Sequence, residues 1–136
     1  MTNSILIGEV IYEVINSSAD VLEYIDDRLW PVVAPWTKPE DIHYPFVVYT
    51  RNNVSAAGLS KDCYSSDSVS FQIDVISSNY TDGLYIANII RSLFEGKYIE
   101  SHGMGIDNIQ MNGIKESFSS DSFIQTLSFS CDITNL

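Results

Sequence analysis

The middle of the chain carries a regular alternation of apolar and polar residues, and the period of this alternation changes near residue 77. Period-two alternation with β-branched and aromatic residues is typical of a strand that buries one face. This pattern therefore predicts a strand over 67–77. The apolar positions are Val69, Phe71, Ile73 and Val75, and the polar ones between them are Ser68, Ser70, Gln72 and Asp74.

Helical spacing follows directly after the break at Ser77-Ser78-Asn79. Short side-chain oxygens at such a break cap the free N–H groups of a helix start. Gly96 comes just after the last apolar residue, where a left-handed helix end favours glycine. The sequence thus predicts a helix lying on one face of a sheet. Its apolar stripe is Leu84, Ala87, Ile90 and Phe94, widened by Ile86, Ile89 and Leu93.

The flanking segments add two helices and three strands. Residues 7–15 show helical spacing in Ile7, Val10, Ile11, Val14 and Ile15, and a shorter helix is predicted from Asp20 to Leu29. Apolar residues in short extended runs, or alternating with polar ones, predict the strands. Gly113 interrupts the strand predicted over residues 106–118 and suggests a bulge there. The predicted strands are Pro45–Arg51, Ile106–Phe118 and Phe123–Thr134.

Three segments are predicted to be irregular. Trp30–Trp36 contains two prolines, which favour extended geometry in the residues before them, so its tryptophans need a surface to lie on. That surface is either the subunit's own sheet or a partner subunit. Asn52–Ser66 lacks periodicity and is expected to be a long, mobile connection between antiparallel strands. Lys97–Gly105 is expected to be a loop.

Together these elements predict an α+β fold formed by a single domain over residues 1–136. The expected sheet has about four strands, is mainly antiparallel, and carries two or three helices on one face. Its order is α(α)-β-β-α-β-β. The length suffices for a hydrophobic core without metal or disulfide support.

The net charge of −11 comes from 18 acids and 7 bases. It argues against sequence-independent binding of nucleic acid or of anionic membranes, because both require clustered lysine and arginine. No apolar run approaches the ~20 residues that cross a bilayer. The N-terminal residues lack a basic region before their apolar stretch, which predicts an intracellular protein. Cys131 lies on the apolar face of a strand and is expected to be buried, whereas Cys63 lies in a polar stretch and is expected to be a free thiol.

The search for chemistry gives no catalytic, cofactor-binding or metal-binding residues. His43 and His102 are too few and too far apart in sequence for a zinc site, and residues 102–105 lack the lysine and the strand–turn–helix context of a phosphate loop. The neighbouring Glu40 and Asp41 need not face one site. The acids on the second helix lack the spacing of a calcium loop and are expected to form a solvated face. We therefore expect no enzyme activity and no cofactor.

The stretches DRLWPVVAP at 27–35, YPFVVYTR at 44–51 and VSFQIDV at 69–75 resemble the tail-completion, or tail-terminator, proteins of tailed bacteriophages. The resemblance extends from Ile5 to Thr134, although the strong acidity and the polar 97–105 segment depart from the family pattern. It implies a virion protein of the tail and neck, assembled in the host cytoplasm. Such a subunit forms a ring, expected to be hexameric, that caps the tail tube and contacts the head connector or stopper protein. DNA passes the bore without specific binding, and no membrane is involved.

Spare apolar surface and basic residues in the family-like segments predict where subunits or partners meet. Two other functions remain open from the residues alone: a cytosolic module that binds a protein or small ligand, and an enzyme that uses its acidic residues. The residues expected at the interface are Arg28, Trp30, Trp36, Arg51, Leu59 and Lys61.

Overall fold

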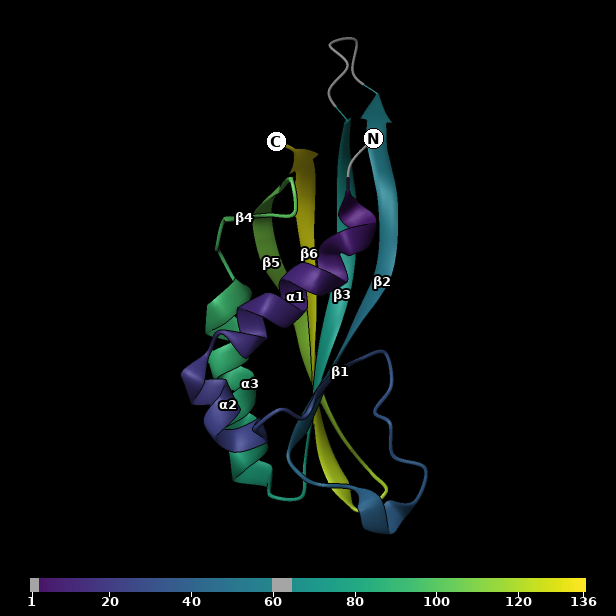
Figure 1. Cartoon of the computed structure of the whole chain (residues 1–136), viewed down its shortest axis with the longest axis vertical. Coiled ribbons are helices and arrows are strands. Elements are labelled where there is room, and N and C mark those ends of the chain that lie inside the picture. Colours follow the sequence, from purple (N-terminus) through teal and green to yellow (C-terminus); the bar gives the residue numbers. More distant parts are fainter. Residues whose placement is uncertain (1–2, 60–64) are drawn as a thin grey trace.

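The computed structural model describes residues 3–59 and 65–136, which form one curled six-stranded sheet with its α-helices on one face (Figure 1). The strand order is β1-β2-β3-β6-β5-β4; β1 runs parallel to β2 and every other pair is antiparallel. The predicted fold class is confirmed. The strands are β1 (Leu29–Pro31), β2 (Phe46–Leu59), β3 (Ser65–Ser77), β4 (Ile99–Ser101), β5 (Met104–Ser119) and β6 (Ser122–Asn135).

The four long strands are those that the sequence predicts, and β1 and β4 are additional short strands at the two edges. Each of these contains three residues, too few for an apolar pattern to be recognised. Each edge strand pairs with only part of its neighbour: β1 with residues 47–49 of β2, and β4 with residues 104–106 of β5. The rest of both neighbours therefore lies at the sheet edge.

The helices are η1 (Ser4–Leu6), α1 (Ile7–Asn16), α2 (Ala19–Ile25), η2 (Pro39–Asp41) and α3 (Tyr80–Phe94). Helix α2 begins at Ala19, one residue before the predicted start, and the Ser18 hydroxyl accepts from the Val21 N–H at 3.3 Å. It ends before Leu29, because Asp26 takes a φ of 59° and turns the chain into β1. Across the described residues, none of the helices is long and apolar enough to cross a membrane.

Helix α3 follows the sequence pattern closely. The Asn79 side chain accepts from the Asp82 N–H at 3.0 Å, and Gly96 after the helix has a φ of +74°. Ile86 and Ile90 are fully buried. The prediction that Leu84 belongs to the buried stripe is wrong, since its side chain is 39% exposed. The helix presents Ile86 rather than Leu84 to the sheet.

The core lies between the helices and the sheet and centres on three phenylalanines. Phe71 on β3 and Phe129 on β6 are register partners, and their rings stack with centroids 5.2 Å apart. Phe94 of α3 packs against both rings at 5.6 Å. All three side chains are buried, as are the other predicted inward positions of the central strand.

The prediction of a long connection over 52–66 is wrong for the residues that the structure describes. Strand β2 continues to Leu59 and pairs with β3 through Val54↔Val69 and Ser55↔Ser68. Backbone pairing continues after a register shift between Arg51 and Asn53, where two successive polar residues, Asn52 and Asn53, break the alternation. Residues 60–64, which include Lys61 and Cys63, lie outside the described residues.

Two further irregularities have identifiable causes. The predicted 97–105 loop contains β4 and a turn at His102 and Gly103, whose φ values of 53° and 75° are left-handed. Strand β5 shifts register between Met111 and Gly113, which confirms the bulge expected near Gly113.

We expect Phe71→Ala and Phe129→Ala each to lower the free energy of unfolding by about 3–5 kcal/mol, because each substitution leaves a cavity between β3, β6 and α3. Chemical denaturation followed by circular dichroism measures the loss. Tyr85→Ala is the control, since it also removes an aromatic ring, but Tyr85 is 57% exposed on α3. Equal losses in the three variants would contradict the assignment of the core.

Burial raises the pKa of the Cys131 thiol to about 12, with the nearby Asp132 carboxylate adding to the effect. The thiol therefore stays protonated in the folded state up to a higher pH than in the unfolded chain. Because the unfolded chain loses this proton first, the free energy of unfolding falls as the pH rises above the ordinary thiol pKa of 9.0. The Cys63→Ser variant retains Cys131 as its single cysteine. At about pH 8, a thiol reagent should leave the native variant unlabelled and should add one label per chain, at Cys131, after unfolding in urea. Rapid labelling of the native protein would show that Cys131 is accessible.

Candidate assembly surface

The two tryptophans of the 30–36 segment pack on the subunit's own sheet, on the face opposite the helices. The ring centroids of Trp30 and Trp36 lie 4.5 Å apart, and those of Trp36 and Phe46 lie 4.9 Å apart. Val48 of β2 and Ile76 of β3 are the other buried members of this cluster. Both faces of β2 are thus covered, as its apolar sequence predicts. The two tryptophans are half-buried, so part of each remains accessible.

A tight turn directly after β1 presents two valines to solvent. Val32 has a φ of +65°, a conformation that is strained for a β-branched residue. The Val33 N–H donates to the Pro31 carbonyl at 2.6 Å, which closes a γ-turn centred on Val32. The Val32 N–H donates to the Tyr49 carbonyl and holds the turn against β2. The side chains of Val32 and Val33 are 68% and 72% exposed.

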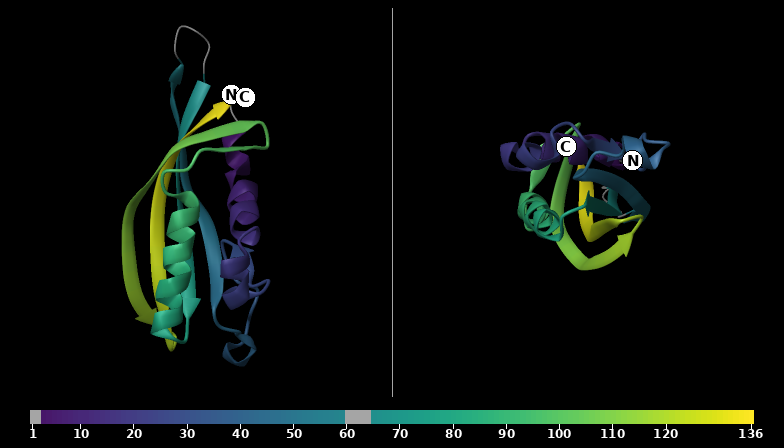
Figure 2. Two further views of the ribbon diagram at one scale, coloured as in Figure 1. Left: turned by 90° about the vertical axis from the view of Figure 1, so that its left-hand side faces the viewer. Right: turned by 90° about the horizontal axis from the view of Figure 1, so that it is seen from below.

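An open hollow of about 410 Å³ lies beside this turn. Its floor includes Asp74, whose carboxylate accepts from the Thr126 hydroxyl at 2.6 Å and from the Gln72 amide at 3.0 Å. Residues near both edges of the sheet, from the turn after β1 and from β5, line the hollow. Figure 2 shows that the sheet is curled, which brings these two edges towards each other. The lining residues are Val32, Val33, Ala34, Phe46, Val48, Asp74, Ile76, Ser117, Ile124 and Thr126.

The end of the β5–β6 hairpin forms a second apolar surface with one fixed carboxylate. Glu116 accepts from the Gln125 amide at 3.0 Å and from the Tyr80 hydroxyl at 2.9 Å. These two donors lower the pKa of Glu116, and the same carboxylate raises the pKa of Tyr80. Phe118 packs on Phe123 with centroids 5.1 Å apart, yet it remains 59% exposed.

The two predicted interface arginines bind main-chain carbonyls of their own chain. Arg28 donates from Nε to the Pro45 carbonyl at 2.9 Å and from Nη2 to the Tyr24 carbonyl at 3.1 Å. Arg51 donates to the Ile5 carbonyl at 3.0 Å. Within the described residues neither arginine pairs with a carboxylate. Arg28 therefore helps to position the segment between α2 and β2.

The six predicted interface residues do not form one surface. Arg28, Trp30 and Trp36 lie around the start of β2. Arg51 lies five residues beyond Phe46 on that strand, about 16 Å away at ~3.3 Å per residue, and Leu59 ends the strand. Lys61 lies outside the described residues. Ile114 and Phe118, which alternate with Lys115 and Ser117, are not among the predicted interface residues.

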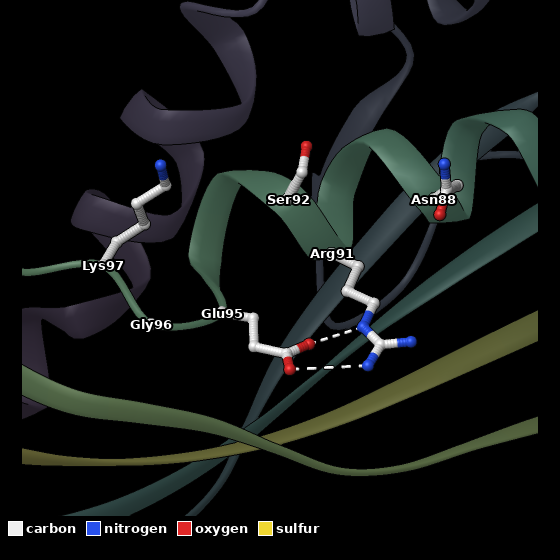
Figure 3. Close-up of a pocket in the computed structure, with 6 residues that line it drawn as sticks. All are labelled: Asn88, Arg91, Ser92, Glu95, Gly96 and Lys97. Carbon is white, nitrogen blue, oxygen red and sulfur yellow. Dashed lines mark hydrogen bonds and ion pairs between the residues drawn. The ribbon is translucent and has the colours of Figure 1, made fainter.

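A polar depression of about 570 Å³ lies at the end of α3 (Figure 3). The Arg91 guanidinium pairs with the Glu95 carboxylate there and lowers the pKa of Glu95. Both side chains are more than a third exposed, so the pair contributes little to stability. Over the described residues, no group of three or more histidine, cysteine and acidic side chains is placed to hold a metal ion.

No protein-family model matches this chain, and no curated protein matches it in sequence. Solved structures do match its fold. One is a chain of the structure titled "Virion of native gene transfer agent (GTA) particle", with a TM-score of 0.70, 15% identity and 92% of both chains covered. Another, titled "Np_888769.1", has a TM-score of 0.63 and 13% identity, and covers 96% of this chain and 95% of that chain. The chain therefore shares its fold with a component of a virion particle.

We expect Arg28→Ala to lower the free energy of unfolding by about 1–3 kcal/mol, because it removes a charged donor from two partly buried carbonyls. Arg51→Ala is the matched control, since Arg51 is exposed and donates to one carbonyl, and it should cost less than about 1 kcal/mol. Denaturant titration of the two variants measures the difference. A larger loss for Arg51→Ala would contradict the role assigned to Arg28.

Proposed function

We propose that this protein is a structural virion subunit of a tailed phage-like particle, acting as a tail terminator that caps the tail tube and joins it to the head connector. The observation that carries the proposal is the fold match to a chain of a gene transfer agent virion over 92% of both chains. A fold alone does not define a function, so the sequence resemblance to tail-completion proteins is the second support.

The segments that carry this resemblance occupy connected parts of the fold. DRLWPVVAP runs from the end of α2 through β1 and the γ-turn, YPFVVYTR leads into β2, and VSFQIDV forms the middle of β3. In a terminator, the first two segments would supply the accessible surface around Trp30 and Trp36. The subunits would form a ring, hexameric as in the family, without enzymatic activity.

The charge of the chain supports a bore through which DNA slides without adhering. Six copies would carry 6 × −11 = −66 formal charges. Repulsion on this scale opposes both ring closure and DNA binding, and salt screens it over a Debye length of about 10 Å at 0.1 M. The ring is therefore expected to need salt, divalent cations or the tail tube to close.

The test is sedimentation across a salt series, with and without purified tail tubes. We expect monomers in dilute low-salt buffer, discrete rings at higher salt, and ring-capped tube ends when tubes are present. A chain that stays monomeric at every salt concentration and does not bind tubes would instead support a small binding module and would overturn the proposal. Turnover that is lost on substitution of acidic residues would support an enzyme.

A further inference from the structure

A small hollow of about 280 Å³ lies between the first turn of α3 and the end of the β5–β6 hairpin. Strand register builds it, because Glu116 pairs with Gln125 and Phe118 with Phe123. Pockets for whole small molecules measure about 300–1,000 Å³, so this volume suits a single side chain. The lining residues are Tyr80, Glu116, Ser117, Phe118, Phe123 and Gln125.

Three aromatic rings form walls of this hollow in different planes. Phe118 and Tyr80 each pack on Phe123, with centroids 5.1 and 5.5 Å apart and interplanar angles of 59° and 69°. Phe118 is 59% exposed and Tyr80 is 41% exposed, so both rings are accessible. The face of an aromatic ring carries negative potential and attracts a cation within about 6 Å of its centre. The hollow therefore offers a cation aromatic surfaces in more than one orientation.

One carboxylate is fixed beside these aromatic rings. Glu116 accepts from the Gln125 amide and the Tyr80 hydroxyl through the same oxygen, Oε2, so its Oε1 has no hydrogen-bond donor among the described residues. The two donors lower the pKa of Glu116, which keeps it ionised at neutral pH. Within the described chain no lysine or arginine pairs with it. Lys115 is its neighbour on β5, but successive side chains of a strand point to opposite faces. The hollow thus holds a negative charge that no cation of the described chain compensates.

A guanidinium group matches both features of the hollow. It is planar and stacks on aromatic rings, and its N–H groups donate to a carboxylate at the same time, which the compact ammonium of lysine does less well. The three arginines of this chain are already bound, because Arg28 and Arg51 donate to main-chain carbonyls and Arg91 pairs with a carboxylate. An arginine for the hollow is therefore expected from another protein rather than from a second copy.

We propose that Tyr80, Phe118 and Glu116 form a binding site for an arginine side chain that a partner protein presents. The guanidinium would lie against the two exposed aromatic rings and donate to Oε1 of Glu116. The net charge of −11 favours such a basic partner over a second acidic copy. The site goes beyond the proposed function, because it belongs to one subunit and forms whether or not subunits assemble.

Titration of the full chain with short blocked peptides, followed by nuclear magnetic resonance, tests the site. The probes are glycine–arginine–glycine, the same peptide with lysine, and the same peptide with citrulline, which keeps the shape of arginine without its charge. The Gln125 side-chain amide and the Tyr80 ring report binding, because both contact Glu116. The arginine peptide should shift both signals with a millimolar dissociation constant, the lysine peptide should bind more weakly, and the citrulline peptide should leave them unchanged.

Two variants remove the recognising groups from exposed positions, so their circular dichroism should match the parent. Glu116→Gln and Phe118→Ala should each weaken binding of the arginine peptide by about ten-fold or more, because they remove the charge or an aromatic wall. Glu100→Gln is the matched control and should bind like the parent. It makes the same charge change at a glutamate that also accepts from a tyrosine, Tyr98 at 3.0 Å, but does not line the hollow.

Four results would overturn the arginine site. They are no binding of the arginine peptide, equal binding of the citrulline peptide, tighter binding of the lysine peptide, and equal weakening by Glu100→Gln. Shifts of the same Gln125 and Tyr80 signals when the chain alone is concentrated would show that a second copy fills the hollow, and would overturn a separate partner. None of these results bears on the capping of tail tubes, which the salt series tests.

Discussion

The stacking of Phe71 on Phe129, covered by Phe94, is the contact on which the fold depends. The two strands at the centre of the sheet meet there in register, and α3 is held across them by the third ring. The other layers converge on the same place. Side chains from five elements surround a gap of about 10 Å³ beside the rings, too small for more than a single water molecule: Ile7, Val10, Ile11, Phe71, Phe94, Ile99, Ile106 and Ile109.

This convergence explains which parts of the fold the sequence could predict. Elements that bury one face on the phenylalanine core must repeat apolar residues at a fixed period. The apolar pattern of the sequence therefore predicts α1, α3, β3 and β6. A register shift interrupts the alternation of β2 between Arg51 and Asn53. The Asn53–Ser55 part of β2 was therefore mistaken for a loop, although its backbone pairs normally. The end of α2 depends on the left-handed Asp26, which its apolar spacing does not indicate.

The candidate surface was predictable only where its composition is unusual. Two tryptophans between prolines required a partner surface, and Phe46 provides it. The same reasoning could not show that Arg28 binds carbonyls of its own chain, because main-chain acceptors leave no pattern in sequence. Ile114 and Phe118 alternate like buried residues but are exposed, on the half of β5 that β4 does not accompany.

Both ends of the described chain are attached to one turn. Asn3 donates through Nδ2 to the His102 carbonyl at 3.1 Å, and the Leu136 N–H donates to the Gly103 carbonyl at 3.0 Å. Asn3 and Leu136 therefore lie together towards one end of the molecule, while η2 and the end of the β5–β6 hairpin lie at the other (Figures 1 and 2). A density label fused to either terminus would mark the same pole of the subunit. Electron micrographs of labelled particles would then reveal the polarity of the protein along the particle axis without an atomic map.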